Sequence, residues 1–191
     1  GHPKIGRVVV VTSLAAHGPN PNEAPATEEA DCHPLTDYGR SKRDAELITL
    51  RYGDRLPVTI VRPPAIYGPR DQQFARLFWL ARRGIVPSIG SGRGLVNVAF
   101  VQDVVSGILL AAEAPKGVGE IFFIGDKRNY RWDEAAAIIA KSVRKRYWRV
   151  PVPRSLLIGF AGALEGVARI LPWTPPITMD QATNFVQNNW S

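Results

Sequence analysis

The sequence is poor in the residues that build disulfide-bonded or metal-binding domains. It contains a single cysteine, Cys32, among 191 residues, which excludes an internal disulfide. That cysteine and the three histidines form no cluster with metal-ligand spacing, so no metal site is expected. The first residues, from Gly1 to Ile5, lack the basic segment and apolar run of a signal peptide. We therefore expect a reduced, cytoplasmic environment.

The sequence also lacks an apolar run long enough to cross a bilayer. Its most apolar stretch, Leu156–Leu171, contains Glu165 and Arg169 and ends at Pro172, so it is too short and too charged to span a membrane. This stretch favours packing inside the protein or at a dimer interface. Peripheral membrane contact through residues 156–171 is the alternative.

Acidic residues are outnumbered, since 24 Lys and Arg face 17 Asp and Glu for a formal net charge of +7. Such a charge indicates an anionic partner. Basic clusters such as Arg82-Arg83 and Arg144-Lys145-Arg146 have no aromatic stacking platform beside them, so nucleic acid is not the expected partner. With 45% hydrophobic and 21% charged residues the chain is globular, and its length suits one domain of ordinary size.

Apolar, β-branched runs alternate with helical patterns along the chain. The expected strands are 8–11, 57–61, 96–100 and 119–124, with a short extended piece at 150–153. The expected helices are 38–52, 74–83, 103–113, 134–143 capped by Asp133, 156–171, and a last helix opened by the capping-box pair Thr178 and Gln181. Residues 90–94, Gly-Ser-Gly-Arg-Gly, are expected to form a flexible turn. This alternation predicts an α/β fold with a parallel sheet.

Two expected strands are followed directly by residues that could contact a ligand. The first runs into Ser13 and the second into Pro63-Pro64, and ligands of parallel sheets bind beyond such carboxyl ends. Tyr38 and Lys42 stand one helical turn apart, so the hydroxyl and the ammonium share a face. An ammonium favours the phenolate of a tyrosine, whose unperturbed pKa is about 10. The pattern fits proton exchange with an alcohol or carbonyl, although an ordinary surface pair has the same spacing.

Four segments together resemble the extended short-chain dehydrogenase/reductase superfamily, in its NAD-dependent epimerase/dehydratase group. In order along the chain they are Val8–Gly18, Tyr38–Lys42, Val61–Asp71 and Asn97–Val104. The resemblance extends from about Val8 to about Trp190. It implies that Tyr38 is the catalytic acid/base, that Lys42 lowers its pKa and binds the nicotinamide ribose, and that Ser13 orients the substrate.

The resemblance also implies roles for the segment after the second strand. Pro63 and Pro64 resemble the residues that lie against the nicotinamide, while Ala65, Tyr67 and Arg70 fall near the substrate pocket. Gln102-Asp103 occupies a position where the family usually has His or Asp followed by Asp. We interpret that pair as a helix start.

The resemblance points to an NAD(P)-dependent oxidoreductase that transfers hydride at a secondary alcohol or ketone. Residues 171–178 are similar to members grouped with 3β-hydroxysteroid dehydrogenases and dihydroflavonol reductases, which favours an apolar, sterol- or flavonoid-like substrate. A nucleotide-sugar epimerase or dehydratase is the first alternative. A non-catalytic fragment acting through protein or membrane contact is the second.

The glycine-rich dinucleotide loop of the family is absent from the sequence, and Gly90–Gly94 does not replace it, because it lies in a loop that leads into an expected strand whereas a phosphate loop follows a strand and opens a helix. We therefore expect the C-terminal half of a Rossmann-type doubly wound sheet (1–66) and a small, mostly helical substrate-binding region (67–191), with a core helix and strand returning at about 95–125. The expected cofactor is NAD or NADP. We expect this fragment to bind it negligibly, and whether the fragment is active by itself stays open. We expect a homo-oligomer, or pairing through the exposed edge of strand 8–11.

Overall fold

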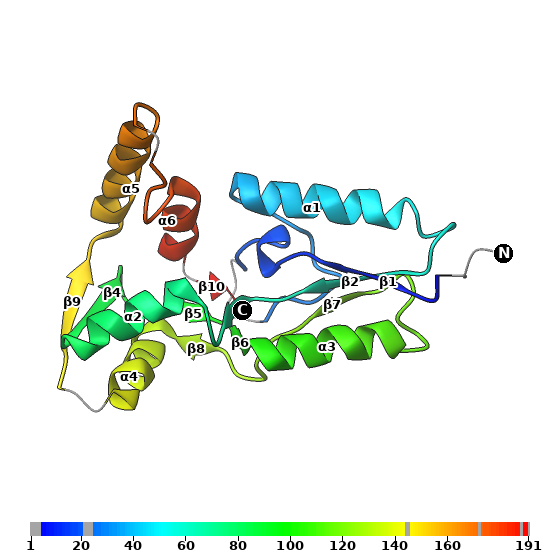
Figure 1. The fold of residues 1–191 in the computed structure, drawn as a ribbon, viewed down its shortest axis with the longest axis horizontal. Helices are drawn as coiled ribbons and strands as arrows, with labels where there is room; N and C mark the ends of the chain where they lie inside the picture. The colour runs from blue at the N-terminus through cyan, green and yellow to red at the C-terminus, as the bar shows by residue number, and fades with distance from the viewer. Residues whose placement is uncertain (1–4, 21–24, 144–145, 172, 188, 191) are drawn as a thin grey trace. The chain divides into compact units, whose positions relative to one another are not determined.

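The computed structural model describes residues 5–20, 25–143, 146–171, 173–187 and 189–190, and the chain folds into two compact units (Figure 1). The first unit comprises residues 1–69, 97–129 and 190–191. The second comprises residues 70–96 and 130–189. Each unit is built from segments that are far apart in the sequence.

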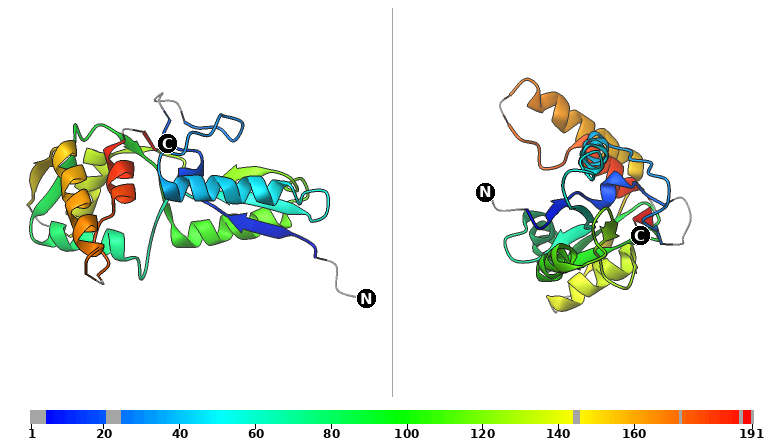
Figure 2. Two further views of the ribbon diagram at one scale, coloured as in Figure 1. Left: turned by 90° about the horizontal axis from the view of Figure 1, so that it is seen from above. Right: turned by 90° about the vertical axis from the view of Figure 1, so that its right-hand side faces the viewer.

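The first unit is organised around a parallel sheet with strand order β1-β2-β7. Its strands are β1 (Val8–Val11), β2 (Val58–Arg62) and β7 (Ile121–Phe123). Helices α1 (Asp37–Leu50) and α3 (Val101–Glu113) cover opposite faces of this sheet (Figures 1 and 2). The central strand β2 is consequently buried at every residue, as expected of an apolar, β-branched strand covered on both faces.

Two shorter elements extend the first unit beyond the carboxyl ends of these strands. A 3-10 helix, η1 (Leu14–Ala16), follows β1 directly. Strand β3 (Ala65–Tyr67) follows β2 and pairs in parallel with β6 (Val98–Phe100). Both strand ends thus continue into ordered backbone, which holds the site residues described below.

The second unit is mostly helical. Helices α2 (Gln72–Arg82) and α4 (Trp132–Ser142) pack on strand β4 (Ile85–Ile89) around a core that contains Ala81, Val86 and Ala140. Strand β4 pairs in parallel with β9 (Trp148–Val152), and β5 (Leu95–Val96) pairs antiparallel with β8 (Tyr130–Arg131). Strand β9 leads into α5 (Arg154–Ala168), which packs against α6 (Met179–Val186), and the last strand is β10 (Asn189–Trp190).

The structure confirms the α/β alternation and the parallel pairing expected from the sequence. It also confirms the capping box, in which Thr178 and Gln181 exchange hydrogen bonds at the start of α6. Helix α3 begins at Val101, so Gln102 and Asp103 lie in its first turn, as expected of a helix start. In the described part of the chain, no helix combines the length and apolarity needed to cross a membrane.

Several boundaries differ from the expectation. Asp133 does not cap α4: the N-cap is Arg131, and Asp133 lies inside the first turn, paired with the Arg131 side chain at 3.1 Å. The acidic residue is favourable there because it complements the positive end of the helix dipole. The expected strand 96–100 is divided at Asn97, whose side chain hydrogen-bonds to the backbone of Asp126 and whose backbone N–H donates to the carbonyl of Trp190.

Strands β1 and β7 form the two edges of the three-stranded sheet, and neither has a further partner strand among the described residues. Val8 and Thr12 donate their backbone N–H groups to Pro57 and Val61 of the β2 segment, both at 2.9 Å. Because donors alternate along a strand, the N–H of Val11 faces the other edge of β1. An apolar strand with such an edge is a template for pairing with another chain.

We expect the chain to self-associate through this edge, and Val11→Pro to shift it towards monomer, because proline removes the outward N–H group. Sedimentation velocity over a concentration series measures the shift. Val11→Thr keeps the N–H and should associate like the wild type. A wild-type chain that stays monomeric at every concentration contradicts the prediction.

Candidate active site

The carboxyl ends of β1 and β2 are joined by backbone hydrogen bonds. The N–H of Leu14 donates to the carbonyl of Pro63 at 2.8 Å, just beyond the last rungs of the ladder. Ser13 stands between β1 and η1 in an extended conformation, and its Oγ accepts the N–H of Ala15 at 3.1 Å. The serine hydroxyl is therefore fixed at the end of the sheet, beside the first proline after β2.

Helix α1 begins against this same corner. Thr36 is the buried N-cap, and its hydroxyl accepts the N–H of Gly39 at 3.1 Å. A Cβ on Gly39 would lie 2.5 Å from the carbonyl oxygen of Ala15, a contact that real side chains do not make. Glycine thus allows the first turn of α1 to touch η1, and this contact brings Tyr38 to the segment that carries Ser13.

Tyr38 and Lys42 occupy one face of the first two turns of α1. The tyrosine side chain is 48% exposed, and the Nζ of Lys42 lies 5.7 Å from the centroid of its ring, within the range of a cation–π contact. A phenol and an ammonium are thereby presented together at the carboxyl edge of the sheet.

The remaining expected site residues follow β2. Pro63 is buried and Pro64 is half-buried, whereas Ala65 and Tyr67 lie exposed on β3. The Tyr67 ring packs against Phe100 of β6, with centroids 5.4 Å apart. Arg70 is exposed, has a φ of 71°, and is the first residue of the second unit.

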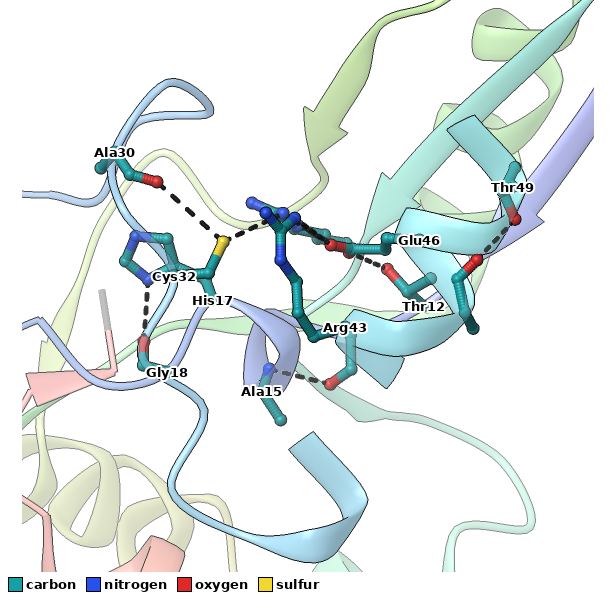
Figure 3. A network of polar contacts seen from close by, with 12 residues as sticks. Thr12, Ala15, His17, Gly18, Ala30, Cys32, Arg43, Glu46 and Thr49 are labelled. Atoms are coloured by element: carbon teal, nitrogen blue, oxygen red, sulfur yellow. Dashed lines mark hydrogen bonds and ion pairs between the residues drawn. The ribbon is translucent and has the colours of Figure 1, made fainter. Parts of the chain in front are cut away.

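A buried ion pair lies directly behind this corner (Figure 3). Arg62, the last residue of β2, donates from Nε and Nη2 to the two carboxylate oxygens of Glu46 on α1, each at 2.7 Å. Both side chains are almost fully buried, with exposures of 1% and 0%. Thr12 donates to the same carboxylate at 2.8 Å and Arg43 at 3.0 Å. Glu46 therefore links α1 to the ends of both β1 and β2.

The guanidinium of Arg62 makes further contacts with the loop before α1. Its Nη2 donates to the Sγ of Cys32 at 3.4 Å, and its Cζ lies 5.3 Å from the centroid of the Phe123 ring on β7. The same ring meets His17 edge to face, with centroids 5.8 Å apart. Arg62, on β2, thus connects helix α1, strand β7 and the loop that contains Cys32.

The ionisation of this pair follows from its contacts. Burial opposes the charged form of Glu46, but the hydrogen bonds from Arg62, Thr12 and Arg43 and the charge of Arg62 outweigh burial and hold the pKa of that carboxyl below its ordinary value. Burial likewise opposes the charged form of Arg62, and the bonds to Glu46 outweigh it, so the pKa of the guanidinium is raised. Both groups are charged at neutral pH.

Glu46 and Arg62 were not predicted to be partners. The available signal was an arginine at the end of the β-branched strand Val58–Arg62, together with a glutamate two turns after Tyr38 and one turn after Lys42. A charged residue at the end of a strand buried at every position needs a partner, and a carboxylate on the adjoining helix provides it.

Comparison with known proteins places these features in a family context. The model of the family described as "NAD dependent epimerase/dehydratase family" matches residues 2–125. A ceramide reductase from Caulobacter vibrioides is 30% identical over 97% of this chain and 53% of its own length. A UDP-glucose 4-epimerase from Vibrio cholerae is 29% identical over 97% of this chain and 65% of its own length. The chain thus spans about half to two thirds of these relatives.

Solved structures agree on the fold. The UDP-glucuronic acid 4-epimerase from Bacillus cereus, solved with UDP-glucuronic acid and NAD, superposes with a TM-score of 0.69 at 19% identity. The superposition covers 96% of this chain and 61% of that protein. The likeness identifies the α/β arrangement as a Rossmann-type fold.

Replacing Glu46 by Gln should destabilise the protein by about 3–5 kcal/mol, because it leaves the Arg62 charge buried without its counter-charge. The loss should shrink at low pH. The native pKa of Glu46 lies below its ordinary value of 4.5, so its stabilisation is complete above that value and disappears as pH falls through the native pKa. Thermal unfolding of wild type and variant between neutral and acidic pH measures both effects.

The control is Asp37→Asn, which breaks the exposed Arg40–Asp37 pair, where the two atoms are 2.6 Å apart. This variant should lose at most about 1 kcal/mol, since an exposed pair and an acidic residue in the first helical turn each contribute little. Equal melting temperatures for Glu46→Gln and Asp37→Asn would contradict the role given to the buried pair.

Gly39→Ala should lower stability by about 1–3 kcal/mol, because the added methyl group pushes α1 away from the Ala15 carbonyl. Gly166→Ala in α5 is the matched control, since a Cβ there meets no atom within 4 Å and alanine favours helix. Chemical denaturation should rank Gly166→Ala at or above wild type and Gly39→Ala below it. The reverse order would show that α1 does not depend on this contact.

Proposed function

The chain belongs to the NAD dependent epimerase/dehydratase family. We propose that it functions as the catalytic part of a nicotinamide-dependent oxidoreductase of the extended short-chain dehydrogenase/reductase type. The reaction is hydride transfer at a secondary alcohol or ketone. The observation that carries the proposal is the placement of Tyr38 and Lys42 on one exposed face of α1, at the carboxyl edge of the sheet. A bound nicotinamide ring supplies or accepts the hydride.

Tyr38 moves the proton. In the oxidation direction its phenolate removes the hydroxyl proton of the alcohol as hydride leaves the carbon, and in reduction its hydroxyl returns that proton to the carbonyl oxygen. We assign to the ammonium of Lys42, whose Nζ lies 5.7 Å from the ring centroid, the role of balancing negative charge that develops on the phenol as the proton moves. The same ammonium would hold the ribose of the cofactor.

Ser13 orients the substrate oxygen. Its Oγ already accepts one hydrogen bond from the Ala15 N–H, which leaves the hydroxyl proton for the reacting oxygen. Pro63 and Pro64 would lie against the nicotinamide, and the hydrogen bond from Leu14 to Pro63 keeps the first of them beside Ser13. Ala65, Tyr67 and Arg70 belong to the substrate side.

The substrate class follows from residue type and relatives together. Ala65 and Tyr67 lie exposed beyond β2 and offer mainly apolar surface, and a relative at 30% identity is named a ceramide reductase. We infer an apolar ketone or alcohol. The relative named UDP-glucose 4-epimerase supports the alternative, a nucleotide sugar. Assays with a steroid or sphingoid ketone beside UDP-glucose separate the two classes.

Tyr38→Phe should lower kcat about 10²–10⁴-fold with little change in KM, because the ring stays and only the transferable proton is lost. Turnover is followed by NADH or NADPH absorbance. The assay uses the protein with any sequence that flanks these 191 residues. Tyr52→Phe, at an equally exposed tyrosine beyond the end of α1, is the control and should keep full activity. Full activity of Tyr38→Phe would refute the mechanism, and absence of both turnover and cofactor binding in the wild type would favour the non-catalytic alternative.

A further inference from the structure

The net positive charge of the chain comes from its second unit. Residues 70–96 and 130–189 contain 13 Lys and Arg against 5 Asp and Glu, a formal net charge of +8. The first unit contains 11 against 12, a net charge of −1. The proposed chemistry belongs mainly to the nearly neutral unit, so the proposed reaction leaves the charge of the second unit unexplained.

Helix α5 of the second unit is apolar on two faces. Its inner face packs on α6: Ala161 is fully buried, and Glu165 accepts the N–H of Met179 at 2.6 Å. Its outer face is formed by residues that recur every three or four positions. These are Leu156, Phe160, Ala163, Val167 and, just past the helix end, Ile170.

The outer face is open to solvent. Phe160 is 56% exposed, Val167 46% and Ile170 83%. At 100° per residue all five positions fall within about 80° of arc, so they form one continuous stripe without a charged member. Exposing such a stripe is unfavourable in water, and large exposed apolar patches mark interaction sites.

Aromatic and basic side chains precede and follow the stripe along the chain. Trp148, at the start of the strand that leads into α5, is 82% exposed, and Trp173, beyond the helix end, is 47% exposed. Arg149 and Arg169 are also exposed, and the Nη1 of Arg149 lies 3.9 Å from a carboxylate oxygen of Asp133. Tryptophan prefers the membrane interface, and basic residues beside it are attracted to anionic lipid headgroups.

We propose that the second unit docks on an anionic lipid surface through this stripe, with α5 lying in the plane of the interface. Its 15 residues extend about 22 Å, less than the hydrocarbon core of about 30 Å, so the helix rests on the bilayer and does not cross it. The proposed lipid-binding surface is an apolar stripe, with indole and guanidinium groups before and after it in the chain. The proposal does not depend on catalysis.

Charge favours lipid over a second copy of the chain as the occupant. Pairing two α5 helices would bury the stripe, but it would also bring two units of charge +8 together, and their repulsion opposes association. An anionic surface buries the same apolar side chains and neutralises the charge. Both the apolar stripe and the excess of basic residues are then explained by one partner.

Flotation with vesicles tests the proposal, because bound protein rises with the lipid whereas aggregates sink. We expect flotation with phosphatidylcholine vesicles that contain about 30 mol% phosphatidylserine, little with phosphatidylcholine alone, and release in about 0.5 M salt. Phe160→Glu and Ile170→Glu should each weaken binding at least about fivefold, since each removes apolar burial and adds negative charge. Leu109→Glu, at a 57% exposed position of α3 in the first unit, should bind like wild type.

Each other outcome has a definite meaning. Equal flotation of wild type, Phe160→Glu and Leu109→Glu would overturn the assignment of the stripe. Absence of wild-type binding to the anionic vesicles would overturn the proposal, and a dimer abolished by Phe160→Glu would then identify a second copy as the occupant. The Tyr38→Phe variant should float like wild type, so failure of the proposed mechanism and failure of membrane docking are distinguishable.

Discussion

The bidentate contact between Arg62 and Glu46 is the interaction on which the first unit depends. Taking two charges out of water is costly, and the cost is offset only when geometry and additional hydrogen bonds are good. Here the carboxylate accepts from Arg62, Thr12 and Arg43, and the guanidinium also reaches Cys32 and Phe123. Helix α1 is thereby fixed against the ends of β1 and β2, where the candidate active site lies.

The site itself is assembled from backbone more than from side-chain packing. The hydrogen bond from Leu14 to Pro63 joins two strand ends, and the close approach of Gly39 to Ala15 sets the first turn of α1. Tyr38 and Lys42 are exposed or half-buried, so they contribute little to stability and are available for chemistry. The buried polar network behind them supplies the rigidity that proton transfer requires.

The sequence predicted elements whose signals are local and missed those that depend on distant partners. The strand expected at 57–61 and found at Val58–Arg62 was recognisable because β-branched residues run together, and the Thr178 capping box because its residues stand three apart. The pair Glu46–Arg62 depends on a contact between residues 16 apart in the chain, which no local periodicity encodes. Strand β4 was missed because it contains Pro87. Within the described residues its sheet has two strands, so each has a free edge where a missing N–H is tolerated.

The first unit contains the single thiol of the chain, Cys32, and the only other sulfur atom belongs to Met179. A thiol reagent can therefore monitor this unit. Cys32 is half-buried, and its Sγ accepts a hydrogen bond from Arg62. A thiol reagent must displace that bond, so the rate at which the single thiol is labelled follows the local opening of the loop around it. The chain thus contains an internal reporter, at one atom, of how often the support behind α1 loosens.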